Sequence, residues 1–196
     1  LSTGFDVSST VTFIDCFSAA LQEAKPEELE FNPDGTKMFI MGETGDDVNE
    51  YTLSTGFDVS TASFVDSFSV KSQEDEPKGL AFTYDGTKMF VTGWENDTVI
   101  EYTLSTGFNV STASFVDTYA IANAVTNCPS GLTFSSDASK MFILSRDCDA
   151  DGNDNEVNVY TLSCYYGVVS CMDPTSDKDD VASVESQTES AKQLIQ

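Results

Sequence analysis

The segment 147–156 carries the clearest arrangement of residues that could bind a metal ion. It reads Asp-Cys-Asp-Ala-Asp-Gly-Asn-Asp-Asn-Glu, with carboxylates at alternate positions before a glycine, as in the first half of a calcium loop. The twelfth position is Asn158 rather than glutamate, so Glu156 or a residue from elsewhere would have to supply the bidentate carboxylate. A solvated acidic loop is the alternative. We expect a structural calcium ion whose ligands are Asp147, Asp149, Asp151, Asn153, Asn155 and Glu156.

Trp94 is the only tryptophan, and it stands in a polar segment that we expect to be a loop. An exposed loop tryptophan can stack on a sugar ring, which makes Trp94 the candidate ligand-binding residue. Packing of its ring against its own hairpin is the alternative.

Five cysteines are compatible with two disulfides and one remaining thiol. Cys164 and Cys171 are close in sequence across a turn, and Cys128 and Cys148 are expected at the same end of one sheet. Cys16 would then be the odd thiol. The alternative is that the cysteines are reduced and buried as small apolar residues.

Nothing in the sequence has the pattern of a catalytic site. Histidine is absent, which removes the commonest general base and zinc ligand, and no G-x-S-x-G or phosphate-binding glycine motif occurs. The acidic loops that begin at Glu43 and Glu95 are expected to be solvated. We therefore predict that the protein is not an enzyme.

The charge balance restricts the partners. The chain has 33 acidic and 9 basic residues, a net charge of -24, which disfavours nucleic acid and anionic lipid. No run of about 18 apolar residues occurs, so we expect no membrane insertion by this segment. A saline extracellular or cell-surface setting would screen the self-repulsion.

Three copies of one unit organise the chain. Asp-Gly-Thr-Lys-Met-Phe occurs at 34–39 and 85–90 and, altered, at 137–142, with successive methionines 51 and 52 residues apart. Asp-Gly predicts a tight turn, and the apolar residues after it predict a strand. The third copy has 16 residues from Met141 to Val157 where the second has 10 from Met89 to Val99, so the calcium motif lies in an insertion.

Each unit has four strand signals with period-2 alternation, which predicts an all-β fold of tandem four-stranded antiparallel blades, a β-propeller-like architecture. A short C-terminal helix follows. The predicted domains are a repeat domain 1–163, a cysteine-containing acidic linker 164–180 and a helical tail 181–196. Within the repeat domain we expect an incomplete blade at 1–20 and further blades at 26–71, 77–122 and 128–163.

A strand near Val11–Ser18 could complete the last blade, but the resulting three blades are fewer than the four to eight that close a ring. Three arrangements stay open: further blades upstream, a ring assembled from several copies, or an open array. Because the chain opens in mid-repeat, we expect upstream sequence.

The pattern F-x-x-D-G-T-K-M-F-V, followed by V-x-E-Y-x-L-S-T-x-F-D-V-S, resembles the YVTN/NHL-like β-propeller repeats of bacterial surface proteins. Similar tandem copies occur in autotransporter-like proteins of marine bacteria. The resemblance covers about 1–162 and implies a displayed scaffold. We expect a secreted or surface-displayed structural and adhesive module that associates with itself, with other surface proteins or with glycans. The alternatives are a carbohydrate-binding propeller assembled from several chains and an extracellular propeller hydrolase or lyase.

Overall fold

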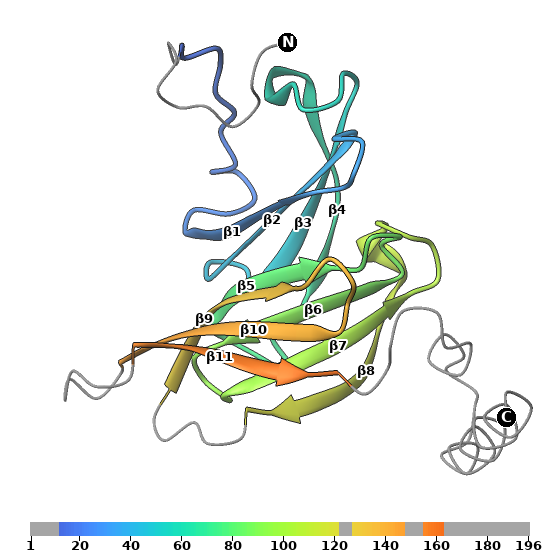
Figure 1. The fold of residues 1–196 in the computed structure, drawn as a ribbon. Helices are drawn as coiled ribbons and strands as arrows, with labels where there is room; N and C mark the ends of the chain where they lie inside the picture. The colour runs from blue at the N-terminus through green and yellow to red at the C-terminus, as the bar shows by residue number, and fades with distance from the viewer. Residues whose placement is uncertain (1–11, 122–126, 148–154, 163–196) are drawn as a thin grey trace, which may run out of the picture. The chain divides into compact units, whose positions relative to one another are not determined.

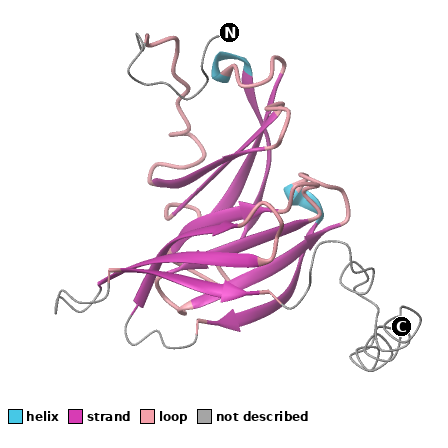
Figure 2. Cartoon of the chain, in the orientation of Figure 1, coloured by secondary structure: helices cyan, strands magenta, loops and turns pink. Residues whose placement is uncertain are grey.

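The computed structural model describes residues 12–121, 127–147 and 155–162, which form three antiparallel sheets with almost no helix (Figures 1 and 2). The all-β prediction of propeller-like blades is confirmed. The first sheet contains β1 (Pro26–Phe31), β2 (Lys37–Gly42), β3 (Asp47–Leu53) and β4 (Ala62–Ser69). The second contains β5 (Pro77–Phe82), β6 (Lys88–Gly93), β7 (Thr98–Leu104) and β8 (Ala113–Ala120). The third contains β9 (Asn127–Phe134), β10 (Lys140–Asp147) and β11 (Glu156–Thr161), in the order β11-β10-β9.

A tight turn joins the first strand of each sheet to the second, as the sequence predicts. In the first copy the Asp34 carboxylate accepts the Thr36 backbone N–H at 2.9 Å, and Gly35 has a φ of 70°. Glycine adopts this left-handed conformation without steric cost. The third copy places Ala138 there, with a φ of 54°.

The second strand of each full blade is apolar because both of its faces are covered. Phe39 and Met41 lie in the core shared by the first and second sheets, whereas Met38 and Ile40 belong to a separate cluster on the opposite face. Alternate residues of a strand point to opposite faces, so a strand buried on both sides needs no polar residue.

Contacts divide the chain into two compact units, Leu1–Thr133 with Ile143–Asn158 and Phe134–Phe142 with Val159–Gln196. In the first unit β1 contacts β5, and a Cβ on Gly79 of β5 would lie 3.0 Å from the Leu132 nitrogen of β9. The first strands of the three sheets are therefore neighbours, as expected for strands around a propeller axis. In the second unit Leu162 N–H donates to Ser139 O at 2.9 Å beside the β9–β10 turn.

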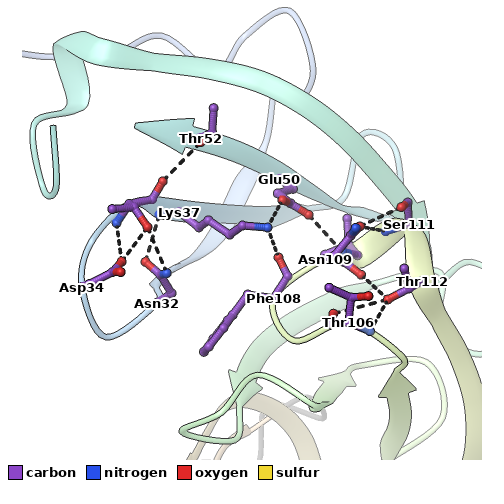
Figure 3. Close-up of polar contacts among 12 residues, drawn as sticks. Asn32, Asp34, Lys37, Glu50, Thr52, Thr106, Phe108, Asn109, Ser111 and Thr112 are labelled. Carbon is purple, nitrogen blue, oxygen red and sulfur yellow. Dashed lines mark hydrogen bonds and ion pairs between the residues drawn. The ribbon is translucent and has the colours of Figure 1, made fainter. Parts of the chain in front are cut away.

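A polar clasp joins the first sheet to the second (Figure 3). The Lys37 ammonium of β2 donates to Glu50 Oε1 at 2.5 Å and to the Phe108 carbonyl oxygen at 2.6 Å. Glu50, on β3, accepts the Val110 backbone N–H at 2.9 Å through Oε2 and is 1% exposed. Val110 begins the 3₁₀ turn η2 (Val110–Thr112), whose preceding residue Asn109 accepts the Ser111 N–H. A second turn of this kind, η1 (Val59–Thr61), precedes β4.

Residues 12–19 form no regular secondary structure, although the sequence predicts an outer strand near Val11–Ser18. The other predicted blade limits stay predictions. The predicted linker 164–180 and helical tail 181–196 lie outside the described residues. No helix in the described part of the chain is long and apolar enough to cross a membrane.

Candidate functional site

The predicted calcium loop is described only at its ends. Asp147 ends β10, Asn155 precedes β11 and the exposed Glu156 begins β11, while Asp149, Asp151 and Asn153 lie outside the described residues. Within residues 12–121, 127–147 and 155–162, no group of three or more His, Cys, Asp or Glu side chains could hold a metal ion. Calcium binding stays a prediction.

The disulfide predictions have the same standing. Cys128 is in β9, but Cys148, Cys164 and Cys171 lie outside the described residues. Cys16 is a free, exposed thiol.

A different set of residues gathers where the blades differ from one another. Two positions of each blade lie at the same end. The first directly follows Pro26, Pro77 or Pro129, and the second is the fifth residue after Met38, Met89 or Met141. In the first and second blades these positions directly follow Pro26 or Pro77 and Gly42 or Gly93. While the surrounding repeat is nearly constant, these positions change their chemistry. We call this set the variable cluster; its members are Glu27, Lys78 and Ser130 at the first position and Glu43, Trp94 and Arg146 at the second.

Lys78 is the centre of the variable cluster. Its side chain is 3% exposed, and its ammonium pairs with Glu27 Oε1 at 3.1 Å and with Glu43 Oε1. The two glutamates come from the first blade and remain partly exposed, 34% for Glu27 and 23% for Glu43. A buried ammonium needs such partners because burial without them is costly.

Trp94 extends the variable cluster to the third blade. The Lys78 ammonium lies 3.9 Å from the centroid of the Trp94 ring, and Arg146 Cζ lies 3.7 Å from it. Two cationic groups thus lie over the Trp94 ring. Both contacts are cation–π interactions, and the ligand-binding role of Trp94 stays a prediction. Arg146 is exposed and is the only arginine of the chain, so the single tryptophan and the single arginine contact each other.

Two buried carboxylates hold the loops that carry the variable cluster. Glu23 accepts the backbone N–H groups of Thr44 and Gly45, which follow Glu43. Glu74 accepts those of Glu95 and Asn96, which follow Trp94. The two glutamates are 51 residues apart, each in the pattern Q-E-x-x-P. These hydrogen bonds fix the start of each loop and so position the side chain before it.

The pKa values of the two carboxylates are shifted in opposite directions. Burial raises the pKa of Glu74 and outweighs its hydrogen bonds from backbone N–H groups. Burial also acts to raise the pKa of Glu23, but the hydrogen bonds from Thr44, Lys25 and Gly45 together hold it below its usual value. The N–H groups at this end of each blade thus require an acceptor, and the carboxylate is part of the loop structure.

Sequence reasoning missed most of the variable cluster. It treated the loop at Glu43 as solvated and did not single out Glu27, Lys78 or Arg146. The available signal was the set of positions at which aligned copies of the repeat differ.

The fold is that of β-propeller proteins. No protein-family model matches the chain, and no curated protein matches its sequence. Among solved structures, a candidate 6-phosphogluconolactonase of Bacteroides fragilis aligns with a TM-score of 0.50 and 14% identity over 69% of this chain and 34% of its own. A second candidate 6-phosphogluconolactonase, from Bacteroides uniformis, gives 0.51 and 14% over 69% and 36%. A luciferin-regenerating enzyme gives 0.50 and 18% over 74% and 47%.

This chain therefore spans between about a third and a half of the length of these structures.

The prediction that the protein is not an enzyme is wrong. It rested on the lack of histidine and of a known catalytic motif, whereas the Lys78 ammonium and the Glu27 carboxylate meet at the beginning of two first strands. Solved structures that share this fold also include proteins described as enzymes. Neither the repeat nor the lack of histidine therefore excludes catalysis.

Proposed function

We propose that the chain is part of a β-propeller hydrolase that acts on a small, hydroxylated and anionic substrate at the variable cluster. The single observation behind this proposal is the contact series from Glu27 and Glu43 through Lys78 and Trp94 to Arg146, across three blades. Carboxylates, a buried ammonium and an exposed guanidinium are groups that an ester or lactone hydrolysis can use. Sugar lactones are the substrate class we favour, a choice supported by the lactonase names among the fold neighbours.

The roles follow from exposure and charge. Glu27 is the most exposed of the two carboxylates on Lys78, so it is placed to take a proton from an attacking water molecule. The water oxygen bonds to the lactone carbonyl carbon, the ring C–O bond breaks, and the ring oxygen takes the proton held by Glu27 to become a hydroxyl. The carboxylic acid that forms then ionises and releases one proton to solvent. Arg146 would bind the anionic group of the substrate or the carboxylate product, since a guanidinium suits a two-oxygen acceptor.

The test is proton release from δ-gluconolactone and 6-phosphogluconolactone at near-neutral pH, measured above the spontaneous rate. We expect catalysed release, a fall of roughly 100-fold or more in kcat for Glu27→Gln, and an increase in KM for Arg146→Gln. Glu28→Gln is the matched control because Glu28 is the next carboxylate on β1, and its side chain accepts the backbone N–H of its neighbour Leu29 rather than pairing with Lys78. A wild-type rate equal to the spontaneous one for both lactones would refute the proposal for this substrate class.

A second candidate function is the surface-displayed adhesive module with the structural calcium loop, extracellular and autotransporter-like. Its support is the outer strand of each full blade, which exposes the same aromatic residue, Phe64 at 45% and Phe115 at 49%. Repeated exposed aromatic groups suit multivalent contact with glycans or other surface proteins. A glycan array with the intact chain, compared with Phe64→Ser and Phe115→Ser together, tests it: loss of binding on substitution supports adhesion, and absence of binding by the wild type contradicts it.

A further inference from the structure

One face of the first sheet exposes apolar side chains whose counterparts in the second sheet are covered. Leu29 of β1 is 52% exposed, whereas its counterpart Leu80 of β5 is 0% exposed and lies in the core between the first two sheets. Phe57, just before the turn η1, is 61% exposed, whereas its counterpart Phe108 packs against that same core. Contiguous exposed apolar side chains are typical of a surface that binds another protein surface.

The turn η1 has the same backbone conformation as η2. Phe57 has a φ of 61° and Phe108 a φ of 56°, both in the left-handed region. The Phe57 N–H donates to Gly35 O at 3.0 Å, and the Phe108 N–H donates to Gly86 O at the same distance. In each turn the preceding side chain accepts the N–H of the turn's second residue at 3.1 Å. The shape of η1 is therefore already that of the turn that takes part in the clasp.

The turn η2 is held by three side chains of the neighbouring blade (Figure 3). The Phe108 carbonyl oxygen accepts the Lys37 ammonium at 2.6 Å, and the Val110 N–H donates to Glu50 at 2.9 Å. The ring of Phe39 lies 6.1 Å from that of Phe108. A lysine, a phenylalanine and a glutamate from β2 and β3 thus recognise one carbonyl, one N–H and one ring.

The corresponding groups of η1 are unused. In the part of the chain that the structure describes, no donor reaches the Phe57 carbonyl oxygen and no acceptor reaches the Val59 N–H. The Phe57 ring contacts Phe31 of its own blade at 5.5 Å, as the Phe108 ring contacts Phe82 at 5.6 Å. The second blade has a further aromatic contact from its neighbour, whereas the first blade has only the contact within itself among the described residues.

A hollow of about 460 Å³ lies against η1, lined by residues 56–60 and by Ile14 and Asp15. Asp58 occupies the position that Asn109 has before η2, so the hollow has two carboxylates beside it where η2 has an amide. Carboxylates beside a carbonyl oxygen favour an ammonium group as the occupant.

We propose that this face of the first sheet, with Leu29, Phe57 and Val59, binds a further four-stranded blade of this repeat, recognised by a Lys–Glu pair and a phenylalanine at the positions of Lys37, Glu50 and Phe39. The ammonium donates to the Phe57 carbonyl oxygen, the carboxylate accepts the Val59 N–H, and the phenylalanine covers the Phe57 ring. The interface between the first and second sheets is the template for each contact.

The first test is amide hydrogen exchange of the native chain, measured by NMR at Val59 and Val110. We expect the Val110 amide to exchange about 10-fold more slowly or less, since it is bound to the buried Glu50. Equal protection of the two amides would overturn the proposal, because another part of the chain would then already cover η1.

The second test supplies the missing partner. In an extended chain, residues 26–76 are repeated once directly after Glu76, so that the added copy of η1 follows a blade with Lys37 and Glu50. We expect two Val59 signals, one exchanging as in the native chain and one protected like Val110. The control carries Lys37→Met and Glu50→Leu in the leading copy only, and the protected signal should be lost. Two unprotected signals, or protection that survives in the control, would overturn the proposal.

A third measurement needs no added blade. Phe108→Ser removes a ring with a partner on the neighbouring blade, whereas Phe57→Ser removes the equivalent ring without one. We expect Phe108→Ser to lower the urea midpoint at least about twice as far as Phe57→Ser. Equal decreases would overturn the proposal. Lactonase activity does not enter any of these outcomes, so these tests are independent of the proposed function.

Discussion

At the scale of single residues, one alanine departs from the conformation that its side chain favours. Ala138 has a φ of 54° at the turn position that Gly35 and Gly86 occupy in the other copies. A left-handed residue with a Cβ is destabilised by about 1–2 kcal/mol. We therefore expect Ala138→Gly to raise the free energy of unfolding in urea by about 1 kcal/mol.

Gly86→Ala is the opposite change and provides the control. Gly86 has a φ of 69°, and a Cβ there would overlap the Phe108 ring. We expect a loss of about 2–3 kcal/mol from the combined backbone strain and overlap. Equal effects of the two substitutions would show that backbone conformation does not decide stability at this turn.

At the scale of elements, the clasp between the first and second sheets predicts unequal roles for two equivalent glutamates. Glu50 is 1% exposed and holds both Lys37 and the Val110 N–H. Glu50→Gln leaves the Lys37 ammonium without its carboxylate, so we expect unfolding to become easier by about 2–4 kcal/mol.

Glu101→Gln is the matched variant in the second blade. Glu101 pairs with Lys88 at 2.6 Å, but their side chains are 29% and 43% exposed, and no described backbone N–H donates to Glu101. A solvated pair of this kind contributes less than about 1 kcal/mol. Urea unfolding of the two variants side by side measures the difference, and similar losses would contradict a special role of the clasp.

The elements also mark the boundary of what sequence alone could predict. The Asp-Gly turns and alternating strands are local patterns, and the sheets follow them closely from Pro77 to Ala120. The variable cluster is not local, because Glu43, Lys78 and Arg146 meet only once neighbouring blades have packed. The repeat pattern does not reveal the variable cluster either, because the pattern is defined by the residues that the copies share.

At the scale of the whole molecule, some carboxyl groups have raised pKa values and others have lowered ones. Together they predict that the free energy of unfolding is greatest at mildly acidic pH. Burial raises the pKa of Glu30, Asp47, Glu74 and Asp97, so the folded state binds these protons more tightly and gains stability as pH falls from neutral. Hydrogen bonds from Ser135 and Ser139 lower the pKa of Asp137 to about 2, and the pKa values of Asp34 and Asp85 are lowered as well. Their contribution is present above about pH 4 and is lost as pH falls toward 2.

We therefore expect the urea concentration at the midpoint of unfolding to increase as the pH is lowered from 7 to about 5. Below about pH 4 we expect it to decrease. The net charge of -24 also contributes, because protonation of carboxylates at lower pH reduces the repulsion among them and so stabilises the folded state. High salt should reduce the part that comes from repulsion between exposed groups and leave the part that comes from burial. A midpoint that declines steadily from pH 7 downward would contradict the assignment of the raised carboxylates.

The variable cluster differs between the blades, whereas the turns and strands that form each blade are nearly constant. Each blade keeps its turns, its strands and, in the first two, its Lys–Glu pair, while two positions carry Glu and Glu, Lys and Trp, or Ser and Arg. Duplication of such a unit copies one set of turns and strands together with two positions whose side chains differ between the copies. We therefore expect that such repeats can acquire different binding surfaces through changes at two positions per blade, while the turns and strands stay the same.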